Sequence, residues 1–308
     1  MRSDDYLSII IPTHCHPFEL NLTLLSLSKQ KGIDFNKFEV IILNTNPNLD
    51  PAYRVAKKYS NKMKVRFVNI TDPKGVLIKN ATYASNLGVK KYACGNLLML
   101  VVDDARVVTP LVLNKTFQAF ERYGDNIAVV TWPYHFYLHS STQGFTVEEC
   151  RKKLEEVRYK RDFYAFNQYA AETNITKSGV HNEATWLGVS AINYMRVGGH
   201  NETSHHAWSD YNLDLFRRLT RNPPVDGIQI PGKANDHWGK IGIGLKLVVL
   251  EGEADFHIHH KMGEALRDFS ILKQTKIDSW KQYEGQNDCI VANKNLSWGT
   301  GESEEVTL

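Results

Sequence analysis

The feature that most constrains the fold is an apolar run that ends in two acids, LLMLVVDDAR at residues 97–106. Consecutive apolar residues of this kind suit a strand that is buried on both faces of a parallel sheet. Asp103 and Asp104 follow at the carboxyl end of that strand, where open α/β sheets bind their ligands. Two adjacent carboxylates need a positive partner, and a hard divalent cation that holds a diphosphate can supply it. For an isolated Asp-Asp pair, the alternative is a cap on the following turn or helix.

Composition narrows the class of protein. The chain has 308 residues, enough for one large α/β domain or two smaller ones. Its formal net charge of +3 gives no support for an electrostatic nucleic-acid binder, so we expect no nucleic-acid partner. The four cysteines are scattered without metal-type spacing, which is typical of reduced thiols in an intracellular protein. With no signal peptide pattern and no apolar run near the ~20 residues that span a bilayer, we expect a cytoplasmic protein without a transmembrane segment.

The first third of the chain alternates strand and helix patterns. The expected strands cover residues 7–11, 38–43, 64–69 and 97–102, and the expected helices cover 18–29, 51–59 and 77–92. This order implies a parallel sheet with right-handed crossovers. Neither a G-x-G-x-x-G nor a P-loop sequence follows any of these strands, which excludes dinucleotide-binding and P-loop folds.

The rest of the chain has longer irregular stretches. The patterns predict an aromatic-rich helical stretch at 147–169, a strand at 185–191, a helix at 209–221 and strands at 245–250 and 254–259. One more helix is expected from residue 263 to about 283, followed by a loosely ordered tail. We therefore expect one domain over residues 1–262, with halves 1–130 and 131–262, and a C-terminal helix and tail over 263–308.

Several short motifs then occur in an order that resembles the family 2 glycosyltransferases with the GT-A fold. They are SIIIPT at 8–13, EVIILN at 39–44, NLG at 86–88, VDDAR at 102–106, GGHNE at 198–202 and WSDYNL at 208–213. The resemblance covers roughly residues 7–262. It implies an α/β fold with a GT-A (Rossmann-like), mostly parallel central sheet flanked by helices in a single catalytic domain. Residues 1–130 would bind a nucleotide sugar, and residues 131–262 would bind the acceptor.

The resemblance also assigns the donor-binding residues. They are Pro12, Thr13, His14, Asn44, Lys79, Asn86, Asp103 and Asp104. Asp104 matches the last carboxylate of the D-x-D motif, which the family uses on a divalent metal, so Mn²⁺ or Mg²⁺ is the expected cofactor. Val102 and Asn44 depart from the family, because acids usually stand at these positions. Lys79 is a candidate for the positive charge that the family places just before Asn86.

A histidine-rich segment follows Asp255 near the end of the resemblance. In a strand, His257 and His259 lie on one face, while the intervening residues lie on the other. Exposed histidines at a strand edge are the ordinary alternative. The family places a metal- or diphosphate-contacting histidine at the end of a late strand, which favours one of the two as a metal ligand beside Asp104 without separating them.

The acceptor side rests on the WSDYNL motif. Asp210 matches a family acid and is the expected general base, which takes the proton of an acceptor hydroxyl. A position in the first turn of a helix would keep this carboxylate ionised, and a plain helix-terminal acid is the alternative. Trp186, Gly188 and Trp208 are expected at the acceptor, where the tryptophan rings either stack on a sugar or pack in the core. Attack from the face opposite the nucleotide implies inversion at the anomeric carbon.

The resulting hypothesis is a metal-dependent, inverting glycosyltransferase that moves a hexosyl-type sugar from a nucleotide-sugar donor to a hydroxyl of a glycan or glycoconjugate acceptor. The family implies a setting in surface glycan or polysaccharide biosynthesis. One rival is a degenerate, non-catalytic scaffold that binds a nucleotide or sugar, which Val102, Asn44 and Ser209 support because each replaces a usual acid. The other rival is a sugar nucleotidyltransferase, but the loop at 12–16 lacks its usual glycine and lysine.

Overall fold

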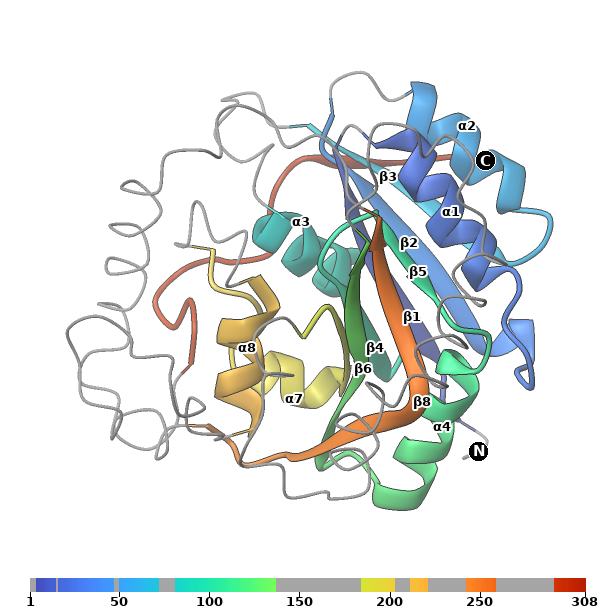
Figure 1. The fold of residues 1–308 in the computed structure, drawn as a ribbon. Coiled ribbons are helices and arrows are strands. Elements are labelled where there is room, and N and C mark those ends of the chain that lie inside the picture. The colour runs from blue at the N-terminus through green and yellow to red at the C-terminus, as the bar shows by residue number, and fades with distance from the viewer. Residues whose placement is uncertain are drawn as a thin grey trace.

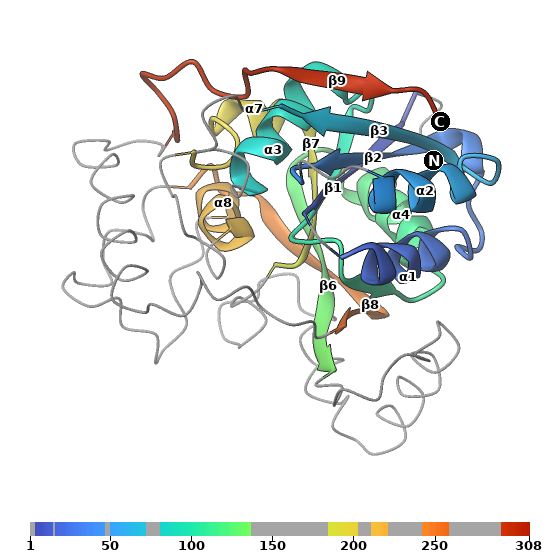
Figure 2. The same ribbon diagram turned by 90° about the horizontal axis from the view of Figure 1, so that it is seen from above.

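The computed structural model describes residues 4–14, 16–46, 50–71, 81–136, 184–202, 211–220, 242–258 and 291–308. Within these ranges nine strands form one sheet in the order β5-β8-β6-β7-β4-β1-β2-β3-β9, with helices on both of its faces (Figures 1 and 2). The expected α/β class with a mostly parallel central sheet is therefore confirmed. None of the described helices combines the length and the apolarity that a bilayer span requires.

The directions of the strands decide which of their ends meet. The strands are β1 (Leu7–Thr13), β2 (Phe38–Asn44), β3 (Lys64–Ile70), β4 (Leu97–Val101), β5 (Arg106–Val108), β6 (Ile127–Phe136), β7 (Trp186–Ser190), β8 (Lys246–Ile258) and β9 (Ser303–Val306). Strands β1 to β4 are mutually parallel. Strand β7 is antiparallel to both β4 and β6, and β6 is parallel to β8. The carboxyl ends of β1, β2, β4 and β8 therefore lie along one edge of the sheet.

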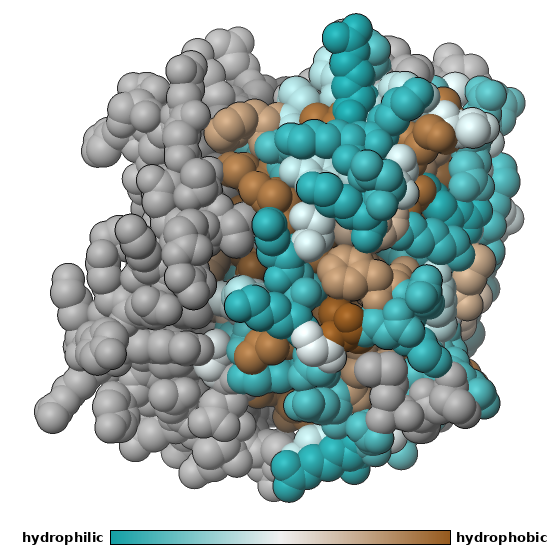
Figure 3. Space-filling view, turned by 90° about the vertical axis from the view of Figure 1, so that its right-hand side faces the viewer, coloured by the Kyte–Doolittle hydropathy of each residue, from teal (hydrophilic) through white to brown (hydrophobic). Residues whose placement is uncertain are grey.

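The helices cover both faces because the central strands are apolar on both sides. The helices are α1 (Pro17–Leu27), α2 (Asp50–Tyr59), α3 (Ala81–Leu87), which continues as a π-helical turn (Gly88–Tyr92), α4 (Val112–Tyr123), α7 (Ala191–Arg196) and α8 (Tyr211–Thr220), and Phe35–Lys37 form a 3-10 turn. Ile9 and Ile11 of β1 pack with α1, α2 and α4, whereas Ile10 packs with α3, α7 and α8. This alternation explains the continuous apolar strands. The surface of the molecule on the side of α1, α2 and α4 is mostly hydrophilic (Figure 3).

The structure corrects the sequence-based elements at two places. The strands predicted at 245–250 and 254–259 form one strand, β8, whose pairing with β6 shifts register between Val130 and Trp132. The structure also contains β5, α4 and β6, which the sequence patterns above do not include. The helical stretches expected at 147–169 and 263–283 lie outside the described residues.

The C-terminal residues are the second correction. A loosely ordered tail is wrong for residues 291–308, because β9 pairs antiparallel with β3 at the edge of the sheet (Figure 2). Arg66 of β3 fixes this strand with hydrogen bonds of 2.8 Å and 2.6 Å to the carboxylate of Glu305. The domain boundary at residue 262 and the division at residue 130 stay predictions, although β9 joins the C-terminal part to the same sheet.

Candidate active site

Asp104 lies where the carboxyl ends of β1 and β4 meet. The residue is 1% exposed, and it follows three residues after the end of β4. One carboxylate oxygen accepts a hydrogen bond from the hydroxyl of Thr13, the last residue of β1. The other oxygen lies 3.2 Å from Nδ1 of His16, the residue that precedes α1. Neighbouring parallel strands thus bring residues of the two predicted donor motifs into direct contact.

His16 is the titratable side chain beside this carboxylate. Burial alone would lower the pKa of His16, but its hydrogen bond to Asp104 and the negative charge of Asp104 outweigh burial and raise the pKa above its usual value. The imidazolium form is therefore favoured at the Asp104 carboxylate. Sequence analysis did not select His16, although the same short loop contains the predicted donor residues Thr13 and His14.

Thr23 of α1 fixes the backbone of the acidic loop. Its hydroxyl is fully buried, donates to the carbonyl oxygen of Asp104 at 2.7 Å and accepts from the amide of Arg106 at 2.9 Å. Two buried backbone groups on either side of Ala105 thereby gain partners. One hydroxyl therefore fixes how the chain leaves the Asp103–Asp104 pair.

Arg106 connects this loop to the late strand β8. Its Nη2 lies 3.3 Å from the Asp103 carboxylate, and its Nη1 lies 3.4 Å from the carboxylate of Asp255. Asp255 is fully buried and also accepts hydrogen bonds from Thr131 at 2.6 Å and Thr185 at 2.8 Å. Burial raises the pKa of Asp255, and the charge of Arg106 opposes that shift. A chain of charged side chains thus runs from the loop after β4 through β5 to β8, partly exposed at Asp103 and buried at Arg106 and Asp255.

The position of His257 fits the expected late-strand histidine. Its backbone pairs with Arg106 on β5 and with His135 on β6, at the carboxyl end of β8. This places residue 257 at the same edge of the sheet as Asp103 and Asp104. The side chain of His257 and the whole of His259 lie outside the described part of the chain.

The described donor set suits a hard divalent cation. The carboxylates of Asp103 and Asp104 are oxygen ligands of the kind that Mg²⁺ and Mn²⁺ prefer, and the Asp104 carboxylate lies 3.2 Å from Nδ1 of His16. Among the described side chains, no group of three or more histidines, cysteines and acids is arranged to hold a metal. The two adjacent carboxylates therefore form part of a possible site, and further ligands would come from beyond these side chains.

Asn44 and His14 lie at the carboxyl ends of β2 and β1, at the same edge of the sheet as Asp104. Asn44 is fully buried, and its amide nitrogen donates to Asn46 O at 2.7 Å and to Asn69 Oδ1 at 3.0 Å. His14 is part-buried and lies 3.0 Å from the hydroxyl of Thr45. A base or ribose could reach Asn44 only after this turn moves. Pro12 continues β1 opposite Leu43, and Lys79 lies outside the described residues.

The side chain of Asn86, which the motif assigns to the donor, contacts the turn 198–202. It is fully buried in α3, where its amide nitrogen donates to His200 O and to Glu202 Oε1, both at 2.8 Å. Its carbonyl oxygen accepts from the backbone amide of His200 at 2.8 Å. The side chain is thus used to hold the turn 198–202, the GGHNE motif.

The same turn reaches the helix that follows the predicted base. His200 is buried between Tyr194 and Asn212, whose polar atoms both lie 2.8 Å from its ring nitrogens. Burial lowers the pKa of His200 to about 4, so its ring is neutral. Asn212 in turn donates to Leu100 O of β4 at 3.1 Å and to Ala184 O at 2.7 Å. The first turn of α8 is therefore fixed to the strand that carries Asp103 and Asp104.

Asp210 immediately precedes α8, which begins at Tyr211. Asp210 and Trp208 lie outside the described residues, so their roles stay predictions. Trp186 is fully buried in the core cluster of α1, α2 and α4, which favours packing over sugar stacking. Gly188 lies within β7, where an added Cβ would come 3.1 Å from Cβ of Val129. Close packing between strands accounts for this glycine.

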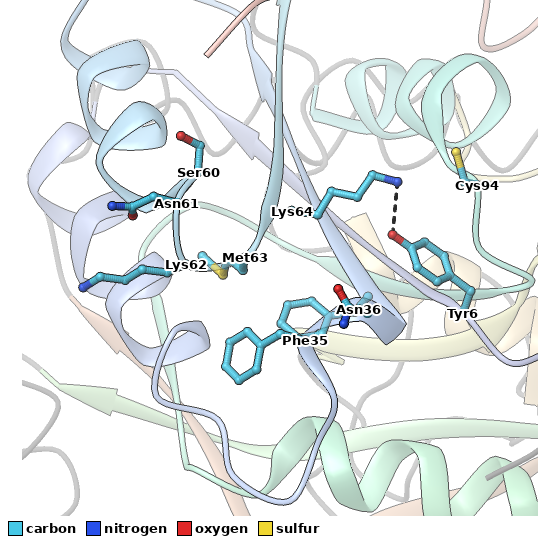
Figure 4. Close-up of a pocket in the computed structure, with 10 residues that line it drawn as sticks. Tyr6, Phe35, Asn36, Ser60, Asn61, Lys62, Met63, Lys64 and Cys94 are labelled. Carbon is cyan, nitrogen blue, oxygen red and sulfur yellow. Dashed lines mark hydrogen bonds between the residues drawn. The ribbon is translucent and has the colours of Figure 1, made fainter.

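A pocket of about 590 Å³ lies at the opposite edge of the sheet (Figure 4). Tyr6, Phe38 and Lys64 contribute to its walls at the amino ends of β1, β2 and β3. Lys64 donates a hydrogen bond to the Tyr6 hydroxyl at 3.2 Å across this pocket. Its place at the amino ends of the strands separates it from the candidate active site.

Sequence analysis did not select four residues of the site, namely His16, Thr23, Asp255 and Asn212. Asn212 stands inside the WSDYNL motif and Asp255 directly precedes the histidine-rich segment, so their positions carried a usable signal. Thr23 lies in α1, a helix with most of its second half buried, and no sequence signal distinguishes it from other helical threonines.

The model of glycosyl transferase family 2 matches residues 8–170, which contain the Thr13–Asp104 contact. The chain belongs to this family. No curated protein matches its sequence.

Solved structures agree on the fold. Residues 1–349 of TarS from S. aureus, in complex with UDP, share 13% identity over 90% of this chain and 72% of that one, with a TM-score of 0.53. The mannosyltransferase PcManGT from Pyrobaculum calidifontis, in complex with GDP-Man and Mn²⁺, shares 12% identity over 93% of this chain and 66% of its own, also with a TM-score of 0.53. GalNAc-T7 with UDP, GalNAc and Mn²⁺ shares 12% identity over 90% and 48% of the two chains, with a TM-score of 0.51. The chain spans 32% of a longer TarS chain that it also matches. The fold is that of the GT-A glycosyltransferases, as the motifs predict.

Proposed function

We propose that this protein is a metal-dependent, inverting glycosyltransferase that transfers a sugar from a nucleotide-sugar donor to a hydroxyl of a glycan or glycoconjugate. The observation that carries this proposal is the buried Asp104, held between Thr13 of β1 and His16 before α1 within the family-matched region. A setting in polysaccharide or surface-glycan biosynthesis and a cytoplasmic location stay predictions from the sequence.

The donor would lie along the carboxyl ends of β1, β2 and β4. Solved proteins of the same fold hold UDP, UDP-GlcNAc or GDP-Man, which supports a nucleoside diphosphate sugar as the donor class. Thr13 and His14 end and follow β1, so they are placed to contact the nucleotide or its phosphates. Asp103, held by Arg106, would face the ribose or the metal.

Asp104, together with His257 or His259, would hold a divalent cation at the diphosphate. Bound there, Mn²⁺ or Mg²⁺ would neutralise the negative charge that develops on the leaving diphosphate. The buried carboxylate is suited to this role because a negative charge removed from water requires a positive partner, and the cation would supply it beside Thr13 and His16. The solved structures of PcManGT and GalNAc-T7 contain Mn²⁺, which supports this choice of cofactor class.

Asp210 would take the proton of the attacking acceptor hydroxyl. The hydrogen bond from Asn212 to Leu100 supports this role, because it fixes the start of α8 beside the carboxyl end of β4. An oxygen nucleophile that attacks from this side, opposite the diphosphate, forms the new C–O bond as the old one breaks, and so inverts the anomeric carbon. Trp208, two residues before Asp210, remains our candidate for stacking on the acceptor sugar.

The test is turnover of candidate donors. UDP-GlcNAc and GDP-mannose are incubated with the purified protein and Mn²⁺, and release of the nucleoside diphosphate is measured with and without added glycans. We expect Asp210→Asn to keep nucleotide affinity but to lose at least about a hundredfold in release. The exposed acid Glu304 on β9 gives the control variant Glu304→Gln, which should behave as wild type. Near wild-type release by Asp210→Asn would remove this residue as the base.

A non-catalytic scaffold that binds a nucleotide or sugar is the second candidate. Asn44 favours the scaffold. It stands at the position that usually contacts the nucleotide, but its side-chain amide donates hydrogen bonds to Asn46 and Asn69 instead. This candidate predicts binding of a nucleotide without release from any donor, in wild type and in Asp210→Asn alike.

A further inference from the structure

The C-terminal segment 291–300 lies against the turn 198–202 through dedicated contacts. The Asn293 side chain donates to Gly198 O at 2.9 Å and to His200 O at 2.7 Å, and it accepts from the backbone amide of Glu202 at 3.1 Å. Beside it, the amide of Ala292 donates to Val197 O at 3.0 Å. One buried side chain therefore satisfies three backbone groups of the turn.

The glycines of the turn are explained by this segment. Gly198 has φ +75°, and a Cβ added there would lie 2.0 Å from Ala292 O. Gly199 has φ +65°, and a Cβ there would lie 2.7 Å from the ring of Trp298. Left-handed backbone and close approach both require glycine at these positions. The GG of the GGHNE motif is thus shaped to receive residues 291–300.

Asn293 itself is in a left-handed conformation with φ +55°, the one non-glycine residue with positive φ among the described residues. Asparagine tolerates this region better than most residues, at some cost in backbone energy. It is also 2% exposed. The side-chain contacts with the turn offset this cost.

A second contact lies at the other end of the segment. The amide of Gly299 donates to Glu202 Oε1 at 2.8 Å, the oxygen that also accepts from Asn86. Lys90 donates to Trp298 O at 2.6 Å, and its ammonium lies 4.5 Å from the centre of the Trp298 ring. The turn is therefore held from α3 on one side and from the C-terminal segment on the other.

We propose that the segment 291–300, through Asn293, positions the acceptor half of the active site. The path is short: Asn293 holds the backbone of His200, the ring of His200 bonds Asn212, and Asn212 fixes the start of α8 to β4. The inference rests on the proposed function in so far as Asp210, immediately before α8, is the base. Asn293 is thus a positioning residue, since it acts through the turn and the helix.

The test uses the full chain with Asn293→Gly, which removes the amide but leaves the backbone free to keep its positive φ. The control is Asn295→Gly, an exposed position in the same turn. Hydrogen–deuterium exchange is followed over residues 198–220 and over β1 and α1. Affinity for UDP and GDP with Mn²⁺, and release of nucleoside diphosphate from the donor that wild type turns over, are measured in parallel.

For Asn293→Gly we expect amide exchange in the turn and the first turn of α8 to rise at least about tenfold, with β1 and α1 unchanged. Nucleotide affinity and the KM for the donor should stay within about twofold of wild type, while kcat falls at least about tenfold, because a displaced base slows chemistry without weakening the donor. Unchanged exchange over 198–220, or an equal loss of donor affinity and kcat, would overturn the inference. If wild type binds no nucleotide, the proposed function fails, and the exchange result still decides the coupling.

Should Asn293→Gly fail to fold, native-state exchange of the wild-type protein in low guanidinium replaces it. We expect residues 291–300, the turn 198–202 and the start of α8 to open together, as one unit with a common free energy of opening. Opening of 291–300 at a lower free energy than the turn and α8, with no effect on their exchange, would contradict the inference.

Discussion

The side-chain amide of Asn212 donates a hydrogen bond of 3.1 Å to the carbonyl oxygen of Leu100. Leu100 lies in β4, three residues before Asp103, and Asn212 lies in the first turn of α8, two residues after Asp210. The two motifs that the sequence assigns to donor and acceptor are therefore joined through residues beside them. This bond fixes the first turn of α8 to the strand that leads into Asp103 and Asp104.

Replacing Asn212 tests this connection. Asn212→Ala removes the side-chain hydrogen bonds to Leu100 O, Ala184 O and a ring nitrogen of His200, so we expect the free energy of unfolding to fall by about 3 kcal/mol. Urea denaturation measures this loss, and Asn295→Ala, at an exposed position, should change it by less than about 0.5 kcal/mol. Equal free energies of unfolding for the two variants would show that the hydrogen bonds of the Asn212 amide do not stabilise the fold.

The hydroxyl of Thr23 offers a test of the acidic loop. Thr23→Val keeps the shape of the side chain but removes the bonds to Asp104 O and Arg106 N, so we expect a loss of about 2 kcal/mol in stability and of about tenfold in Mn²⁺-dependent nucleotide affinity. Thr116→Val is the matched control, because Thr116 is equally buried and its hydroxyl bonds only Val112 O within α4. Calorimetric titration of both variants distinguishes loop geometry from general destabilisation. The same loss of affinity in both would argue against a role for Thr23 at the site.

Asp255 is predicted to act on the site through Arg106. Asp255→Asn removes the negative partner of Arg106, and we expect nucleotide affinity in the presence of Mn²⁺ to fall about tenfold or more as Asp103 shifts. Glu253→Gln is a control on the same strand, because Glu253 is also buried but contacts Thr109 at 2.6 Å and Lys115 of α4 at 2.9 Å. It should lower stability and leave nucleotide affinity unchanged. Wild-type nucleotide affinity in Asp255→Asn would show that Asp255 has a role in core packing alone and does not position Asp103.

His200 makes stability depend on pH. Its folded-state pKa of about 4 lies below the unfolded value near 6.5, so below pH 6.5 the unfolded chain binds a proton that the folded protein does not. Stability is therefore lost as pH falls from about 6.5 towards 4, by up to about 3 kcal/mol. Urea denaturation of wild type and His200→Gln across this range should give a steeper loss for wild type. Parallel curves would mean that His200 does not stay neutral in the folded protein.

The local patterns of the sequence predict much of the fold. The apolar runs of β1, β2 and β4 are buried on both faces, and their short connections leave few other arrangements. The C-terminal strand β9 could not be predicted in this way. It has two glutamates in four residues, a composition that is typical of an exposed chain end. Its place is set by Arg66, which lies 239 residues earlier in the chain. No local pattern contains that pairing.

The site shows the same limit. Motif positions located Asp104 correctly at the carboxyl end of β4, but its contact with Thr13 joins residues 91 apart in sequence, and the Arg106–Asp255 pair joins residues 149 apart. Asn44 and Asn86 hold the motif positions, yet packing directs both amides into the protein. Whether a polar side chain faces a ligand or a neighbouring turn depends on such long-range packing.

The most direct test of the central claim is calorimetric titration of UDP and GDP into the wild-type protein and Asp104→Asn, each with and without Mn²⁺. Asp34→Asn, on the exposed 3-10 turn, is the control. We predict that wild type binds at least one of the two nucleotides more tightly with Mn²⁺, and that Asp104→Asn loses this metal-linked gain by at least about tenfold while remaining folded. Equal affinities with and without Mn²⁺, or an unchanged metal effect in Asp104→Asn, would contradict a donor site built on this carboxylate.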